Sequence, residues 1–168
     1  SHPSADVAAG GYVRRSVGRK DKARLPRGYA RDRMMNVHNY LSNELRSIAM
    51  GSALVRREAL NGIQFPERLR FDEDTLFWAS VLTRSDVAAI PRPIMIYNVG
   101  DERFVDRFTV GARKEFLKLA IEVKKLKAFG IDDAVIQWRK GWIARRIARA
   151  FIAIGDPVSA RPFMRLAR

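Results

Sequence analysis

The spacing of apolar residues divides the chain into a first part that mixes strands with helices and a last part that is helical. Four runs rich in β-forming residues predict short strands: residues 5–13, 50–56, 85–90 and 94–97. Apolar residues at three- and four-residue spacing predict helices over residues 34–46 and 72–82. This order of strands and helices predicts an α/β or α+β architecture with a short mixed sheet.

Glycine and proline interrupt the predicted strands. Gly10 and Gly11 lie inside the first strand, where they tolerate a bulge or the close approach of a neighbouring segment. The last two strands are separated by Pro91-Arg92-Pro93, and prolines keep such strands short. We therefore expect these two strands to form an edge of the sheet.

Two longer helices are predicted towards the C-terminus. Apolar residues recur at helical spacing over residues 116–129 and stop at Gly130, a residue type that commonly ends helices. A second helix is predicted over residues 132–154. The chain is thus predicted to comprise a mixed α/β part, residues 1–110, and a C-terminal helical extension, residues 111–168.

The net charge of the chain indicates which kinds of partner it binds. Lysine and arginine number 32 against 18 aspartates and glutamates, a net charge of +14, which predicts an anionic partner such as nucleic acid, a membrane surface or a phosphate-bearing substrate. The basic segment 14–33 has few apolar residues, so we expect a loop that stays mobile until an anion orders it. Cysteine is absent, which excludes disulfides and thiol chemistry. Because the chain lacks a signal-peptide pattern and an initial Met, we expect it to be part of a longer gene product.

Three consecutive carboxylates, Asp72-Glu73-Asp74, open the helix predicted over residues 72–82. The positive end of a helix favours ionised carboxylates, and a general base must be an ionised group that is held rigidly yet open to a pocket. Acidic residues at a helix start also commonly act only as caps that stabilise the helix. The trio alone leaves both interpretations open.

Further motifs flank this trio in a fixed order. They are Gly51-Ser52-Ala53-Leu54-Val55-Arg56-Arg57-Glu58-Ala59-Leu60, then Phe65-Pro66, Glu73-Asp74-Thr75-Leu76-Phe77, Ile90-Pro91-Arg92-Pro93-Ile94 and Tyr97. In order and spacing they resemble family 2 glycosyltransferases, in which a glycine-led strand precedes a phenylalanine, a Glu-Asp pair that opens a helix, and a proline-bounded strand that ends in tyrosine. The resemblance covers residues 5–97 well and the later helices loosely.

The resemblance implies a partial GT-A fold and inverting transfer of a sugar from a nucleotide-sugar donor to a hydroxyl of a glycan or lipid-linked acceptor. The expected setting is bacterial synthesis of surface polysaccharide or glycolipid. By position, Asp74 would be the catalytic base, and Glu73 would orient the acceptor or the loop. Asp72 would cap the helix or exchange roles within the trio. Further candidates for contact with the acceptor are His38, Arg56 and Tyr97.

Asp72-Glu73-Asp74 also fits the Asp-x-Asp pattern with which that family holds a divalent metal and the nucleotide diphosphate. That motif should follow an apolar strand, whereas here it follows residues 66–70 and leads into a helix. We therefore predict no metal ligand in this chain. The nucleotide-sugar donor and Mn²⁺ or Mg²⁺ are expected in the complete enzyme, the donor-binding half is expected to lie outside this chain, and the isolated chain is expected to be inactive.

Indoles and guanidinium groups share one side of the last predicted helix: Trp138, Trp142, Arg145 and Arg149. This combination suits anionic lipid headgroups, which would place the protein in the cytoplasm at the inner face of the membrane. The other interpretation is that both tryptophans pack inside the domain and only the arginines are solvated. A non-catalytic basic module that binds a membrane surface or nucleic acid is the alternative to a transferase, although the sequence shows no helix-turn-helix, zinc or RNA-recognition motif.

Overall fold

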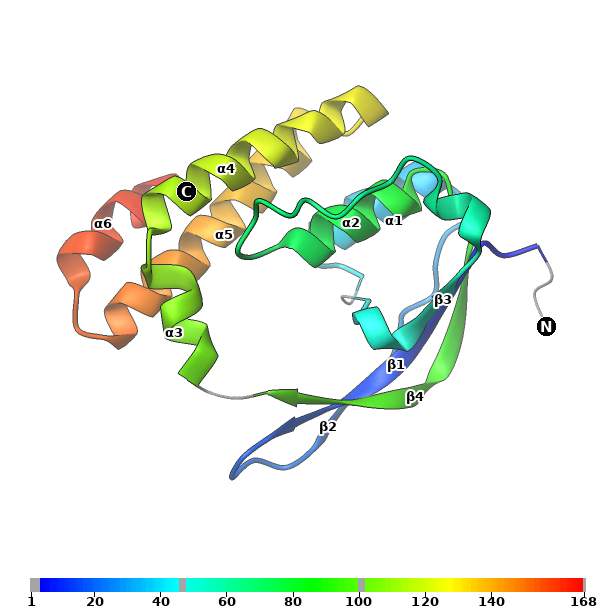
Figure 1. The fold of residues 1–168 in the computed structure, drawn as a ribbon, viewed down its shortest axis with the longest axis horizontal. Helices are drawn as coiled ribbons and strands as arrows, with labels where there is room; N and C mark the ends of the chain where they lie inside the picture. The colour runs from blue at the N-terminus through cyan, green and yellow to red at the C-terminus, as the bar shows by residue number, and fades with distance from the viewer. Residues whose placement is uncertain (1–3, 46–47, 100–101, 168) are drawn as a thin grey trace. The chain divides into compact units, whose positions relative to one another are not determined.

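The computed structural model describes residues 4–45, 48–99 and 102–167 and has a mixed α/β fold (Figure 1). The chain forms two compact units. One comprises Ser1–Phe65 and Asp74–Gly100 and holds the sheet, and the other comprises Pro66–Glu73 and Asp101–Arg168 and is helical. The predicted mixed architecture is thus confirmed. The helical unit takes up residues 66–73 as well as the C-terminal part of the chain.

The sheet is built around β1 (Val7–Ser16), the central strand with which the other strands pair. β4 (Val87–Val99) runs parallel to β1 along its whole length, from the pair Val7↔Val87 to the pair Ser16↔Val99. The short strands β2 (Lys22–Arg24) and β3 (Ala53–Val55) pair with β1 antiparallel, so they share its other edge. The result is the short mixed sheet that the sequence predicts.

Proline does not divide β4, contrary to the prediction of two separate strands. β4 continues through Pro91 and Pro93, and the register shifts on either side of Gly11 absorb the irregularity, since Gly10 pairs with Ile90 and Gly11 with Pro93. Among the described residues β4 pairs only with β1. An edge strand tolerates proline because the missing N–H would face away from the ladder, so the predicted edge position is confirmed.

The two glycines of β1 are required by close packing. A Cβ atom added at Gly11 would lie 2.8 Å from the carbonyl oxygen of Arg24 and 3.1 Å from that of Arg92. One added at Gly10 would meet mainly the side chain of Ile94, 2.5 Å from its Cδ1. Backbone cannot move aside as a side chain can, so Gly11 is the stricter requirement.

Gly11→Ala is therefore expected to lower the free energy of unfolding by about 1–3 kcal/mol, as overpacking of a tight site commonly does. Gly10→Ala is expected to lower it less, because Ile94 can rotate. Gly28→Ala is the control, since a Cβ there would contact no atom within 4 Å; it should be neutral or slightly stabilising. Urea unfolding of the three variants checks this order, and equal effects at Gly11 and Gly28 would contradict it.

The described part of the sheet-containing unit includes two α-helices, the second of them from Asp74 onward. α1 (Arg33–Leu41) is shorter than predicted and begins after Asp32, whose carboxylate accepts hydrogen bonds from the amides of Met34 and Met35. α2 (Glu73–Leu82) starts one residue later than predicted and buries most of its side chains from Thr75 onward. Short 3₁₀ turns, η1 (Met50–Ser52) and η2 (Arg57–Leu60), flank β3.

The basic segment 14–33 is not a loop throughout. β1 extends to Ser16, and β2 follows after a turn across which Arg15 pairs with Asp21. The end of the segment is anchored, because the Asn36 amide exchanges two hydrogen bonds with the backbone of Ala30. The neighbouring Tyr29 is half-buried, and burial raises its pKa to about 12. The loop prediction was therefore wrong in part, while the mobility of the segment stays a prediction.

The described part of the helical unit contains two α-helices that the sequence predicts and two that it does not. The predicted ones are α4 (Ala112–Lys125), continued by the 3₁₀ turn η3 (Leu126–Phe129) up to Gly130, and α5 (Asp133–Ala153). The others are α3 (Glu102–Thr109) and α6 (Pro157–Leu166) (Figure 1). None of the helices in the described part combines the length and apolar character that crossing a bilayer requires.

The unpredicted helix α6 begins at the sequence that ends α5. Gly155 has a left-handed backbone, the Asp156 carboxylate accepts a hydrogen bond from the amide of Ser159, and Pro157 occupies the first helical position. Proline is favoured at that position because the first N–H of a helix has no partner within the helix. The same three residues therefore stop one helix and start the next.

Candidate functional site

Asp72 is the most enclosed member of the acidic trio. Its side chain is only 3% exposed, and its Oδ2 accepts a hydrogen bond of 2.7 Å from Nε of Arg139, which is equally buried. A second guanidinium, that of Arg146, lies 3.8 Å from Oδ1. These residues all belong to the helical unit, with both arginines on α5. Asp72 therefore anchors residues 66–73 within that unit.

Two aromatic rings contact the residues next to this ion pair. Phe71 stacks on Phe108 with ring centroids 4.9 Å apart, and the guanidinium of Arg146 lies over the Phe108 ring at 4.5 Å from its centroid. Asp72 itself has a left-handed backbone, with φ of 64°, which is uncommon for residues other than glycine and best tolerated by Asn and Asp. The ion pair thus holds an unusual turn directly before α2.

Glu73 is held by a different arginine. Nη2 of Arg107, on α3, lies 2.8 Å from Oε1 and 3.0 Å from Oε2 of Glu73. The same guanidinium donates from Nε to the carbonyl oxygen of Arg70 at 3.1 Å. Arg107 therefore ties the first residue of α2 to the segment that leads into it.

Asp74 differs from both of its neighbours. Its Oδ1 accepts a hydrogen bond of 2.8 Å from the amide of Thr75 and lies 3.4 Å from the Thr75 hydroxyl. The side chain is half-buried, and within the described part of the chain it forms no ion pair with lysine or arginine. The three carboxylates thus have three environments, and among the described residues only that of Asp74 leaves the negative charge without a basic partner.

The other acceptor-binding candidates lie in the sheet-containing unit. His38 is half-buried on α1, where its carbonyl oxygen accepts from the hydroxyl of Ser42. Arg56 donates from Nε to the carbonyl oxygen of Ala5 at 3.0 Å. Tyr97 is exposed on β4 and meets Tyr12 edge to face, with centroids 5.9 Å apart. None of the hydrogen bonds of Asp74 found in the described residues involves these three side chains, and their roles stay predictions.

The α5 tryptophans form a shallow cavity in the helical unit. The Trp138 and Trp142 rings are nearly parallel, 6° apart, with centroids at 5.7 Å. They border a space of about 350 Å³ together with Gln137, Gly141, Arg145 and the last residues of α6, Leu166 and Ala167. Trp138 is 40% exposed. The groove therefore presents indole surface beside a guanidinium group.

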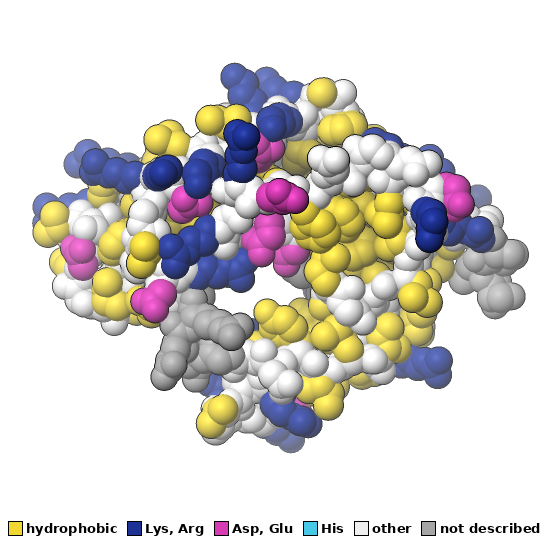
Figure 2. Space-filling view, in the orientation of Figure 1, with side chains coloured by type: hydrophobic (Ala, Val, Ile, Leu, Met, Phe, Trp, Pro, Cys, Tyr) yellow, Lys and Arg dark blue, Asp and Glu magenta, His cyan; other side chains and the backbone are white. Residues whose placement is uncertain are grey.

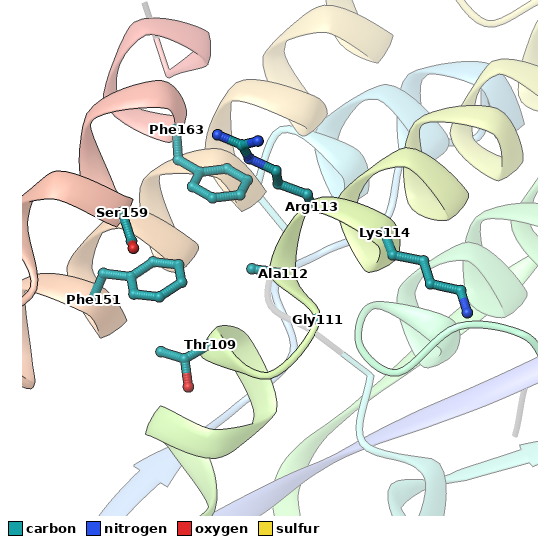
Figure 3. Close-up of a pocket in the computed structure, with 8 residues that line it drawn as sticks. All are labelled: Thr109, Gly111, Ala112, Arg113, Lys114, Phe151, Ser159 and Phe163. Carbon is teal, nitrogen blue, oxygen red and sulfur yellow. The ribbon is translucent and has the colours of Figure 1, made fainter.

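A second cavity, of about 440 Å³, lies in the same unit and was missed by sequence reasoning (Figure 3). Figure 3 shows the rings of Phe151 and Phe163 facing the start of α4, with the Arg113 side chain extending towards Phe163 and Lys114 extending away. The remaining lining comes from Thr109, Gly111, Ala112 and Ser159. Since α6 supplies Ser159 and Phe163, a prediction without α6 could not have found this cavity.

The placement of acidic and histidine side chains bears on metal binding. Within residues 4–45, 48–99 and 102–167 no group of three or more such side chains could hold a metal ion. In the acidic trio, Asp72 and Glu73 each form an ion pair with a different arginine, so their carboxylates do not converge on one point. The divalent ion expected in a complete enzyme stays a prediction.

Comparison of the chain with protein-family models, curated proteins and solved structures gives no match. The resemblance to family 2 glycosyltransferases therefore rests on the motifs between Gly51 and Tyr97. The mixed α/β fold is compatible with it, and the GT-A architecture stays a prediction.

Proposed function

We propose that this chain forms the acceptor side of an inverting glycosyltransferase with GT-A architecture, and that Asp74 is its catalytic base. The observation that carries the proposal is that the three carboxylates of the acidic trio have different partners. Asp72 and Glu73 are each neutralised by an arginine, whereas Asp74 has, among the described residues, only hydrogen-bond donors from Thr75. A carboxylate paired with guanidinium is a poor proton acceptor, so Asp74 is the member of the trio suited to that role.

The chemistry required of Asp74 is limited to one proton. In an inverting transfer the acceptor hydroxyl attacks the anomeric carbon of the donor from the side opposite the nucleoside diphosphate, which leaves with the bonding electrons. Asp74 would take the hydroxyl proton as the new bond forms. Because Oδ1 is held by the Thr75 amide, the carboxylate has a fixed orientation and its other oxygen is the proton acceptor.

Arg139 and Arg107 hold the two residues that precede Asp74. The two residues before Asp74 are both held by side-chain ion pairs, Asp72 by Arg139 and Glu73 by Arg107. A general base must stay within hydrogen-bonding reach of its proton throughout the reaction. The ion pair with Arg107 holds Glu73, the residue that is covalently joined to the proposed base.

The same proposal includes the sugar donor and the cellular site of the reaction. The nucleotide sugar, and Mn²⁺ or Mg²⁺ to balance the charge of its leaving group, would be bound by polypeptide outside these 168 residues. The acceptor would be a glycan or a lipid-linked sugar in surface polysaccharide or glycolipid synthesis, at the cytoplasmic face of a membrane. The sugar transferred is to be found by assay.

The direct test is transfer from a panel of nucleotide sugars, with Mn²⁺, by the natural gene product that contains this sequence and by the 168-residue chain. We expect transfer only by the longer protein, with inversion at the anomeric carbon read by NMR of the product. Retention of the anomeric configuration, or no transfer from any donor by the longer protein, would rule out the proposal.

A further inference from the structure

A stripe of aromatic, basic and aliphatic residues runs along the outer side of α5. Its members are spaced by three and four residues, so they lie above one another on one face of the helix: Trp138, Trp142, Arg145, Arg149 and Ile152. The last turn of α6 adjoins this stripe, because Leu166 and Ala167 line the same groove as the two tryptophans. That turn exposes Arg165 and Leu166. We refer to the five residues of the stripe and these two residues of α6 as the α5–α6 face.

The apolar members of this face are open to solvent. Ile152 and Leu166 are each about half exposed, and Trp138 is 40% exposed. Apolar surface that is grouped and rimmed by cations is typical of sites that contact other molecules. Gly141 contributes to the opening of the groove, since a Cβ there would lie 3.5 Å from the carbonyl oxygen of Leu166.

The charges of the face are all positive. Within the described part of the chain, Arg145, Arg149 and Arg165 form no salt bridge, and the face contains no acidic residue. On the side of the molecule in view, Figure 2 shows many lysine and arginine side chains over the helical unit, so positive charge alone does not single out this face. On α4, however, Lys118 and Lys125 are paired with Glu115 and Glu122. Across the described ranges, only the α5–α6 face combines unpaired arginines with stacked indoles.

We propose that the α5–α6 face docks on an anionic phospholipid bilayer, lying in its interface with the indoles and aliphatic side chains inserted among the headgroups. Tryptophan favours the membrane interface, where its ring is apolar and its N–H stays hydrated, and arginine adds attraction to lipid phosphates. A duplex nucleic acid would satisfy the arginines but would leave Trp138, Ile152 and Leu166 exposed to water. The lipid surface is therefore the better match to the whole face.

Docking of the α5–α6 face is independent of the proposed catalysis, because no residue of the acidic trio takes part in it. The docking also requires no membrane-spanning segment, since an interfacial helix buries only one face in the headgroup region. A protein held in this way would be peripheral to the membrane.

Intrinsic tryptophan fluorescence provides the first test, using vesicles of phosphatidylglycerol and phosphatidylcholine. Trp78 is only 1% exposed in the sheet-containing unit and gives a constant background, so any response comes from α5. We expect a blue shift on addition of the vesicles and quenching by brominated acyl chains. Trp138→Phe/Trp142→Phe, which keeps aromatic packing, should remove the quenching.

Co-sedimentation with the same vesicles provides the second test. Each arginine near an anionic surface strengthens binding roughly fivefold, so Arg145→Gln/Arg149→Gln should weaken partitioning on the order of 25-fold. The matched control Lys114→Gln/Lys124→Gln removes the same charge from exposed positions of α4 and should have a smaller effect. Equal weakening by the two variants would overturn the assignment. Absence of bromolipid quenching together with duplex DNA binding that depends on Arg145 and Arg149 would instead identify a nucleic-acid surface.

Discussion

Asp74→Asn is expected to lower sugar transfer by about 10²–10⁴-fold in the gene product that contains this chain, while stability changes little. The amide has the shape of the carboxylate and its oxygen can still accept the hydrogen bond from Thr75, but it cannot take the proton of an acceptor hydroxyl. General-base catalysis contributes roughly that factor in enzymes. The measurement is kcat for transfer, with thermal unfolding recorded in parallel.

Asp32→Asn is the matched control for this prediction. Asp32 also accepts hydrogen bonds from backbone amides at the start of a helix, those of Met34 and Met35 on α1, but no motif gives it a catalytic role. Asparagine is as good an N-cap as aspartate at position 32, and at position 74, inside α2, its oxygen can still accept from the Thr75 amide, so both variants should preserve stability. If the Asp74 variant transfers sugar as fast as the Asp32 variant, Asp74 only stabilises the start of α2 and the proposed base assignment is wrong.

Arg139→Met is expected to destabilise the helical unit by about 3–5 kcal/mol, the usual effect of removing one partner from a buried ion pair. Asp72 would then be left charged and buried, with the guanidinium of Arg146 at 3.8 Å as its remaining basic neighbour among the described residues. Urea unfolding followed by circular dichroism measures this loss. Methionine keeps most of the volume of the arginine side chain, so the effect reports the charge rather than a cavity.

Two further variants make this prediction specific. Asp72→Asn/Arg139→Met removes both charges, and asparagine accepts the left-handed backbone at position 72, so the double variant should be more stable than Arg139→Met alone. Arg15→Met breaks an Arg–Asp pair of similar geometry on the surface, where both side chains are substantially exposed, and should have little effect. Strict additivity of the two substitutions at 72 and 139 would show that the pair is not coupled.

Local patterns were sufficient for most of the elements. Helical spacing predicted α2, α4 and α5, and glycine and aspartate marked the ends of α4 and α5, because periodicity and capping are properties of neighbouring residues. The same reasoning missed α6, since Gly155-Asp156-Pro157 has the composition of a helix end and acts as a helix start only because residues 158–166 pack as a helix against α5. It also read β4 as two strands, because only pairing with β1 shows that Gly11 absorbs the register shift.

Sequence by itself determined that the acidic trio lies at the start of a helix, that indoles and arginines share one side of α5, and that the chain carries a charge of +14. These features depend on order and spacing along the chain. Only the tertiary structure decided which carboxylates are neutralised, because Arg107 and Arg139 lie 34 and 67 residues away from their partners. It also decided that the end of α6 lies beside the α5 tryptophans. Contacts between residues far apart in sequence follow from the packing of whole elements, which local patterns do not encode.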